Sequence, residues 1–243
     1  MSMQVEKEKR SEHSIGLING FIAYIIWGAV ILYWPYLAPA QPLEILAHRI
    51  LWSLLFVAAI LIYQKRIVSL KVVMNNARQM KLLAVASVLI GVNWGLFIWA
   101  SMNGHVLDSS LGYYITPLLN VALGVFFFKE KLRRMQWLAI SIAAFAVMFI
   151  TIAMGVVPWV ALSLSTSFTM YGYVKKLANV QALESLMIET LILTPVAIGY
   201  LIWLQFNGGN TFLEYGLDHT LWMASAGIFT AIPLLAFGVA ITR

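Results

Sequence analysis

The amino-acid sequence predicts an all-α polytopic membrane protein with eight spanning helices, and three observations support that prediction. Hydrophobic residues make up 61% of the 243 positions and charged residues only 11%, whereas soluble domains contain about 45–50% apolar and about 25% charged residues. Eight continuous apolar runs each approach the roughly 20 residues that a helix needs to cross about 30 Å of hydrocarbon. Nearly all basic residues lie in alternate connections between those runs.

The apolar runs are continuous and lack the alternation that marks the strands of a β-barrel. Helices are therefore expected, because a helix satisfies its backbone hydrogen bonds internally, as lipid requires. Asp108, Ser109 and Ser110 are predicted to cap the fourth span. In chain order, we expect the spans at 15–34, 43–63, 82–102, 108–128, 135–153, 157–174, 183–205 and 221–241.

The distribution of basic residues predicts a cytoplasmic N-terminus, because Lys and Arg concentrate in cytoplasmic connections. Arg49, within the second span, is the one basic residue outside the predicted cytoplasmic segments; the other fifteen of the sixteen lie in them. Those segments are 1–14, 64–81, 129–134, 175–182 and Arg243. The predicted outer segments, which contain no Lys or Arg, are 35–42, 103–107, 154–156 and 206–220.

A weak internal repeat appears when the sequence is shifted by 140 positions. Residues 33–51 and 173–191 then share eight identities in nineteen, among them Gln41 with Gln181 and Glu44 with Glu184. This register matches spans one, two and three with six, seven and eight, so the repeat unit has five helices and its second copy is inverted. Inverted repeats are typical of secondary transporters, whose solute site lies where the copies meet.

We expect residues 1–153 to form the first five-helix repeat with a short cytoplasmic tail, and 154–243 to form an incomplete second repeat. Nothing corresponds to spans four and five in the second copy. The sequence is therefore interpreted as eight helices of an expected ten, truncated at the C-terminus.

Several segments resemble EamA-type members of the drug/metabolite transporter superfamily. They are SSLGYYITPLLN at 109–120, FKEKL at 128–132, Gln136-Trp137, and two that are similar to its RarD branch, EILAHRILWS at 44–53 and GVNW at 91–94. The resemblance covers the whole chain. It implies a ten-helix permease of the bacterial inner membrane with both termini cytoplasmic, in which the ninth helix helps to wall the central cavity.

Arg49 and Glu189 are repeat counterparts within spans, where ionisable residues are costly and usually functional. Arg49 either anchors a polar or anionic group of the solute, or gates it, or extends to the outer interface beside Glu44. Glu189 either lines the inner half of the same pathway or meets Lys175 or Lys176. The inverted repeat places the two charges in opposite halves of the membrane.

Further polar residues within spans are candidates for the solute pathway or for proton coupling. Glu44 and His48 are four residues apart and share a helix face; they either carry a coupling proton or orient a neighbour. Asn93, beside Trp94, either contacts the solute or joins two helices. The polar wall of the fourth span is predicted to comprise Tyr114, Thr116 and Asn120, although tyrosines there also suit the membrane interface.

These features favour a secondary transporter of a small organic solute that works by alternating access. The alternatives are an intramembrane enzyme acting on a lipid or peptide through Glu44, His48 and Arg49, or a non-transporting remnant. We expect no catalysis and no cofactor, because no phosphate-binding loop or zinc motif occurs, and the histidines at 13, 48, 105 and 219 are scattered. The expected partners are a small solute and the lipid bilayer, with no nucleic acid and with a homodimer to be tested.

Overall fold

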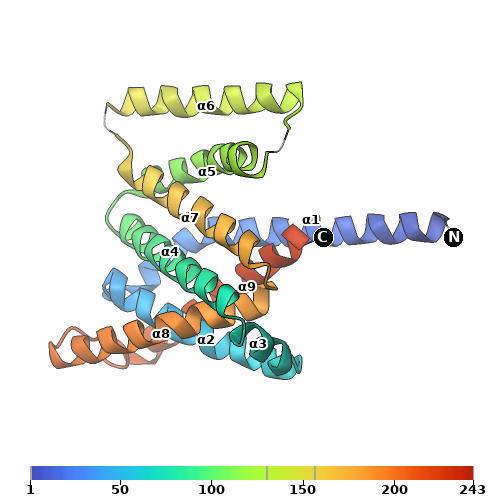
Figure 1. The fold of residues 1–243 in the computed structure, drawn as a ribbon. Helices are drawn as coiled ribbons and strands as arrows, with labels where there is room; N and C mark the ends of the chain where they lie inside the picture. Colours follow the sequence, from blue (N-terminus) through green and yellow to red (C-terminus); the bar gives the residue numbers. More distant parts are fainter. Residues whose placement is uncertain (1, 130, 156, 243) are drawn as a thin grey trace. The chain divides into compact units, whose positions relative to one another are not determined.

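The computed structural model describes residues 2–129, 131–155 and 157–242, and every regular element in these ranges is a helix (Figure 1). Two of the elements are short 3₁₀ turns and the others are α-helices. Their bounds are α1 Ser2–Ala29, η1 Val30–Leu32, η2 Trp34–Leu37, α2 Pro42–Tyr63, α3 Ile67–Met74, α4 Ala77–Met102, α5 Val106–Phe128, α6 Arg134–Met154, α7 Trp159–Ala178, α8 Ala182–Phe206 and α9 Gly216–Thr242.

The prediction of a polytopic α-helical membrane protein is confirmed. Among the described residues, seven helices are long and apolar enough to cross a bilayer, namely the apolar part of α1 together with α2, α4, α5, α6, α8 and α9. The predicted span 157–174 also forms a helix, α7, but it is not one of the seven. Its serines, threonines, Lys175 and Lys176 make α7 less apolar than α2, α4, α5, α6, α8 and α9.

Three local features differ from the sequence-based expectations. The first span leaves α-helical geometry after Ala29 and continues as two 3₁₀ turns, the second of which contains Pro35, a residue with no backbone N–H to donate. The predicted cytoplasmic segment 64–81 contains an additional helix, α3. The predicted cap of the fourth span is wrong, because α5 begins at Val106 and Ser109 and Ser110 instead donate to carbonyls one turn earlier.

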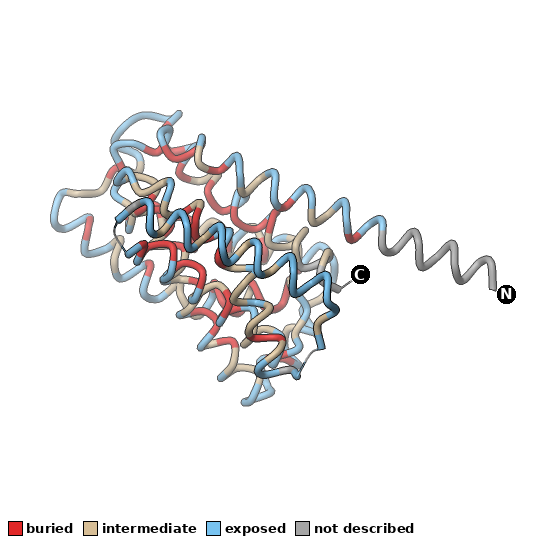
Figure 2. The backbone as a smooth tube through the Cα atoms, turned by 90° about the horizontal axis from the view of Figure 1, so that it is seen from above, coloured by how far each residue is buried: buried red, intermediate tan, exposed pale blue. Residues whose placement is uncertain are grey.

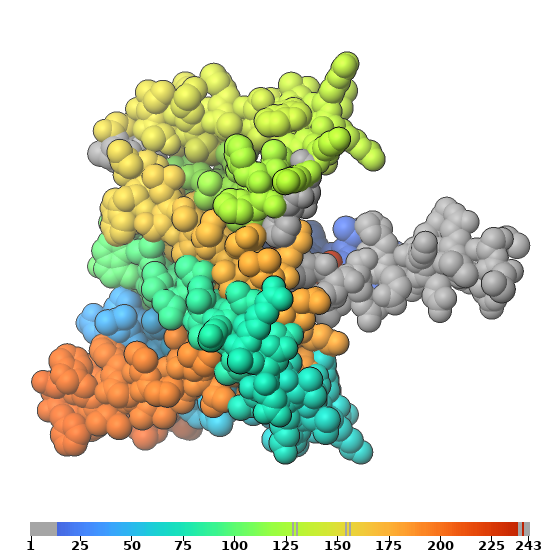
Figure 3. Space-filling view, viewed as in Figure 1, coloured from blue at the N-terminus to red at the C-terminus, as the bar shows by residue number. Residues whose placement is uncertain are grey.

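The chain forms two compact units, the first containing residues up to Leu83 together with those from Asn179 onward. In this unit α9 contacts both α1 and α2, and α8 contacts α2. Residues whose apolar side chains have almost no exposed surface form its core, and buried positions are marked in red along the backbone in Figure 2. They include Ile45, Val57, Leu61, Ile188 and Met223. The short helix α3 lies against α8, teal and orange respectively in Figure 3.

Helices α2 and α9 approach so closely at Gly227 that only glycine fits. A Cβ atom on Gly227 would lie 2.3 Å from the carbonyl carbon of Trp52 and 2.5 Å from the backbone nitrogen of Ser53. Ser53 Oγ donates a hydrogen bond to the Gly227 carbonyl at 3.3 Å. Small residues allow this kind of backbone contact between membrane helices, where dispersion and interhelical hydrogen bonds replace the hydrophobic effect.

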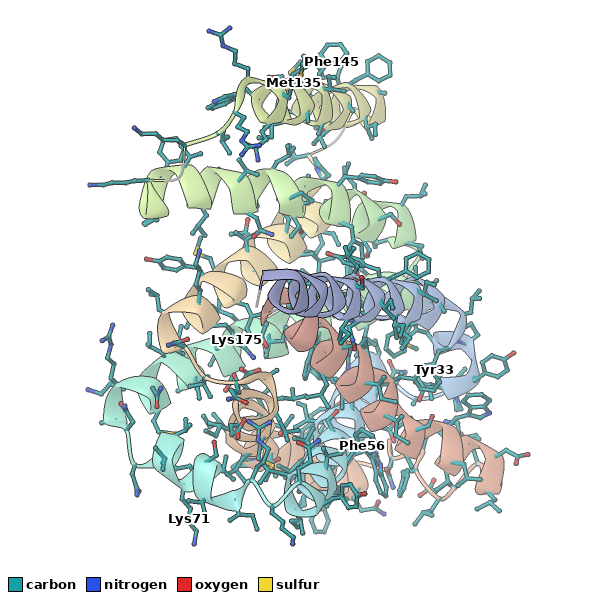
Figure 4. The ribbon with its side chains drawn as sticks, turned by 90° about the vertical axis from the view of Figure 1, so that its right-hand side faces the viewer. Tyr33, Phe56, Lys71, Met135, Phe145 and Lys175 are labelled. Atoms are coloured by element: carbon teal, nitrogen blue, oxygen red, sulfur yellow. The ribbon has the colours of Figure 1, made fainter. Side chains whose placement is uncertain are left out.

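The second unit, residues Ala84–Ala178, centres on the packing of α5 against α7. Leu111, Ile115 and Ala161 form its buried apolar contact. Within the described part of α6, the apolar window 134–153 contains no buried residue, and Met135 and Phe145 extend from that helix in Figure 4. Such a surface suits lipid, which is as apolar as the side chains that face it.

Replacing Gly227 with alanine is expected to lower the free energy of unfolding by about 1–3 kcal/mol, because backbone atoms of α2 cannot move aside as a side chain could. Thermal unfolding of the purified protein in detergent measures the effect. Gly199→Ala is the matched control, since its Cβ meets nothing within 4 Å. Equal midpoints for the two variants would contradict the close approach.

Candidate functional site

Charged and polar side chains are buried in the first unit mainly along α2 and α8. Ionisable groups inside a membrane protein are costly unless they find partners, and they usually mark a pathway or a relay. The buried set on these two helices consists of Glu44, His48, Arg49, Ser53, Glu184, Ser185, Glu189 and Thr190. The partners of each charged side chain therefore indicate whether that side chain only stabilises the fold or is also placed to bind a solute or a proton.

The first turns of α2 and α8 each carry a buried glutamate that contacts the segment following the other helix. Glu44 Oε1 accepts hydrogen bonds from the backbone N–H and the Oγ1 hydroxyl of Thr211, at 2.7 and 2.9 Å. Thr211 follows the end of α8. These contacts place the start of α2 beside the end of α8.

At the opposite end of the pair, one guanidinium nitrogen of Arg66 lies 2.7 and 2.8 Å from the two carboxylate oxygens of Glu184. The same nitrogen also donates to the Gln181 side chain. Arg66 follows the end of α2, and Gln181 and Glu184 begin α8. Helices α2 and α8 are therefore antiparallel, and each is held at its start by a residue that follows its neighbour.

Arg49 and Glu189 are both buried within spanning helices of the first unit. The Arg49 guanidinium donates through Nε to the hydroxyl of Thr230 on α9. Ser185, one turn before Glu189, donates to its Oε1 at 2.6 Å. Glu189 has no exposed surface and Arg49 has 8%. Both charges are thus held in the helical core of this unit.

Glu44 and His48 share a face of α2, as their spacing predicts. The His48 ring stacks on Phe212, with centroids 4.4 Å apart and an interplanar angle of 28°. Glu44 Oε2 and His48 Nε2 are buried and have no hydrogen-bond partner. Buried polar atoms are nearly always paired, so these two atoms are candidates for binding a proton or a ligand.

His219 belongs to the same unit, and the sequence analysis assigned it no role. It lies in the first turns of α9 and is buried, and its Nε2 is 3.1 Å from the Leu37 carbonyl oxygen. Its Nδ1 has no partner. A histidine at the start of an apolar span is a sequence signal that could have identified it. In the part of the chain that is described, no group of three or more His, Asp or Glu side chains could hold a metal.

Asn93 joins α4 to α7 in the second unit. Its Nδ2 donates to the Leu164 carbonyl and to Ser167 Oγ, both at 2.9 Å. The neighbouring Trp94 is buried. The amide thus makes the helix-joining contact that was one of its two predicted roles, while contact with a solute stays a prediction.

The candidates on α5 do not converge on one another. Thr116 Oγ1 donates to the Gly112 carbonyl at 2.8 Å, within its own helix. Tyr114 and Asn120 are exposed.

The second unit has a pocket further along α5, facing α7. Apolar side chains and two threonines line it, namely Leu119, Ala122, Leu123, Phe126, Phe127, Thr166, Thr169 and Met170. Glu130 of the FKEKL segment lies outside the described residues.

Comparisons with known proteins give a consistent match. Residues 14–152 match the EamA-like transporter family. The chain is 44% identical to "Protein RarD" of Streptomyces exfoliatus, over 99% of this chain and 75% of the relative. It is 40% identical to "Protein RarD" of Escherichia coli (strain K12), over 94% and 77%, and 39% identical to "Uncharacterized transporter YojE" of Bacillus subtilis (strain 168), over 94% and 77%. No solved structure matches the chain.

Arg66 and Glu184 are expected to be energetically coupled, because removing the guanidinium leaves a buried carboxylate without its cation. In a double-mutant cycle with Arg66→Ala and Glu184→Ala, we expect a coupling of about 1–3 kcal/mol in unfolding free energy. Partial exposure of Arg66 favours the lower end. Pairing Glu184→Ala with Arg78→Ala, an exposed cation, gives the control cycle, whose effects should add. If the changes in unfolding free energy caused by Arg66→Ala and Glu184→Ala also add, the contact is refuted.

Proposed function

This chain belongs to the EamA-like transporter family as a RarD-type member, and from that premise we propose that it moves a small organic solute across the bacterial inner membrane by alternating access. The chain is a multi-pass membrane protein of a transporter family. Relatives in the family are named as transporters, which weighs against the intramembrane enzyme considered from the sequence. The bacterial sources of the relatives support the inner membrane as its location.

The proposed mechanism uses two inverted repeats, with the pathway along their interface. The contacts of α2 and α8 support the repeat. Glu44 and Glu184, which are equivalent under the 140-residue shift, each occupy the first turn of a helix and each contact the segment after the other helix. Two equivalent helices in opposite orientations produce such a reciprocal arrangement.

Arg49 and Glu189 are the proposed charged residues of the pathway, and their burial at equivalent positions of α2 and α8 is the observation on which this assignment rests. A buried guanidinium would recognise an anionic or polar group of the solute. A buried carboxylate would balance that charge or bind a cationic group. Asn93, Trp94, Tyr114, Thr116 and Asn120 are proposed to contribute polar and aromatic surface to the pathway.

Glu44 and His48 are proposed to couple transport to protons. No ATP-binding loop occurs in the sequence, so a gradient of solute or ions would drive net movement. A carboxylate and an imidazole one turn apart on a spanning helix are groups that can take up and release a proton.

Arg49→Ala and Asn93→Ala are expected to reduce solute exchange at least tenfold. A thermal-shift screen of small organic solutes on the purified full-length protein first identifies a ligand, since a solute at 100 times its Kd stabilises by about 2.7 kcal/mol. Counterflow of that solute in proteoliposomes then measures flux. The exposed cation Lys71 supplies the control, Lys71→Ala. Unchanged flux in both test variants would overturn the site assignment.

The orientation can be tested directly, because the sequence contains no cysteine and single cysteines need no altered background. In intact cells, an impermeant thiol reagent is expected to label Glu214→Cys, between α8 and α9, and to spare Lys71→Cys on α3. Both side chains are exposed. Permeabilised cells should show labelling at both positions. Labelling of position 71 in intact cells, or protection of position 214, would contradict the inverted arrangement.

A further inference from the structure

Among the buried polar atoms of the first unit that have no hydrogen-bond partner, three belong to titratable side chains outside the Arg66–Glu184 ion pair. They are Glu44 Oε2, His48 Nε2 and His219 Nδ1. Each residue is at least nine-tenths buried. Unpaired buried polar atoms are uncommon in folded proteins and call for an explanation, such as a strained group, a catalytic role or a bound species.

The fold ties these three residues together through residues 211–213, the segment that leads into α9. Thr211 donates twice to Glu44 Oε1, and the next residue, Phe212, stacks on His48. The backbone N–H of Leu213 donates to Thr220 Oγ1 at 3.2 Å, and Thr220 adjoins His219.

The protonation of His219 follows from its one hydrogen bond. A backbone carbonyl oxygen only accepts, so the Nε2 that faces the Leu37 carbonyl must carry the hydrogen. In a neutral imidazole the other ring nitrogen is then an acceptor. His219 Nδ1 is therefore a basic atom without a donor, as is Glu44 Oε2 when the carboxylate is ionised. Each of these atoms can therefore accept a proton.

We infer that Glu44, His48 and His219 form one buried site that binds a single exchangeable proton. This inference rests on the proposed transport function and deepens it by adding His219 and by fixing the stoichiometry. No metal-binding group occurs among the described residues. A proton also requires no cavity, which suits side chains that are almost completely enclosed.

The charges around the cluster explain why it binds one proton. Glu44 is the buried carboxylate of the cluster, so one imidazolium balances it, and a second would leave an uncompensated positive charge away from water. Arg49, the next residue after His48, adds to that penalty. The other titratable groups on the neighbouring elements are Tyr200 of α8 and Tyr215, whose ring centroid is 5.8 Å from His219. Glu214 and Asp218 are exposed to solvent.

Titration of the full-length protein labelled with ¹⁵N-histidine tests the site without a transported solute. In the wild type, the His48 and His219 signals are expected to change together and to report uptake of one proton. His219→Gln retains a side-chain donor for the Leu37 carbonyl but lacks a basic nitrogen. It should change the proton affinity of His48 by about tenfold or more. Glu44→Gln should lower that affinity by a similar factor, because it removes the balancing charge.

His105→Asn is the matched control, because His105 belongs to the second unit, where its Nδ1 contacts Asp108 at 2.9 Å. It should leave the His48 titration unchanged. Independent uptake of one proton by each of His48 and His219, or a His48 titration unaffected by both His219→Gln and Glu44→Gln, would overturn the shared site. Absent solute flux with linked titration would refute the transport proposal alone, whereas unlinked titration with normal flux would refute only the proton site.

Discussion

The structure depends on one constraint, which is that lipid provides no hydrogen bonds to a polar group inside the membrane. Backbone groups meet this constraint by forming helices, and polar side chains must meet it by finding one another. Asn93 bonds to a neighbouring helix, Arg49 bonds to Thr230, and Glu189 accepts from Ser185. The polar side chains that make these contacts, within a helix or between helices, are the ones proposed above to engage a solute or an ion.

The antiparallel helices α2 and α8 meet this constraint in equivalent ways at their two ends. Each helix begins with a buried glutamate near the positive end of its macrodipole, where a carboxylate is favoured. The partners differ at the two ends. At one end Thr211 supplies neutral donors, while at the other Arg66 supplies a cation. Because the Arg66 pair is partly exposed and the Thr211 contact is buried, ionic strength acts mainly on the former.

Helix positions were predictable because hydrophobic length and turn residues act locally. The second span was expected at 43–63 and forms at Pro42–Tyr63, where Pro42 is favoured at the start of a helix. The shared face of Glu44 and His48 follows from helical periodicity. The proposed role of His219 could not be predicted in this way, because it depends on the contacts that residues 211–213 make with α2 and α9. The cap of α5 was predicted wrongly because Ser109 and Ser110 can also donate to carbonyls within a helix.

The contact at Gly227 has a mechanical consequence. Backbone atoms of α2 and α9 approach closely there without an intervening side chain, so a motion of one helix at this point is transmitted directly to the other. In the proposed alternating-access cycle, the two helices would then move together. Arg49 and Thr230 would move together in such a motion. The bending needed for alternating access would then occur in the connections at the ends of α2 and α9.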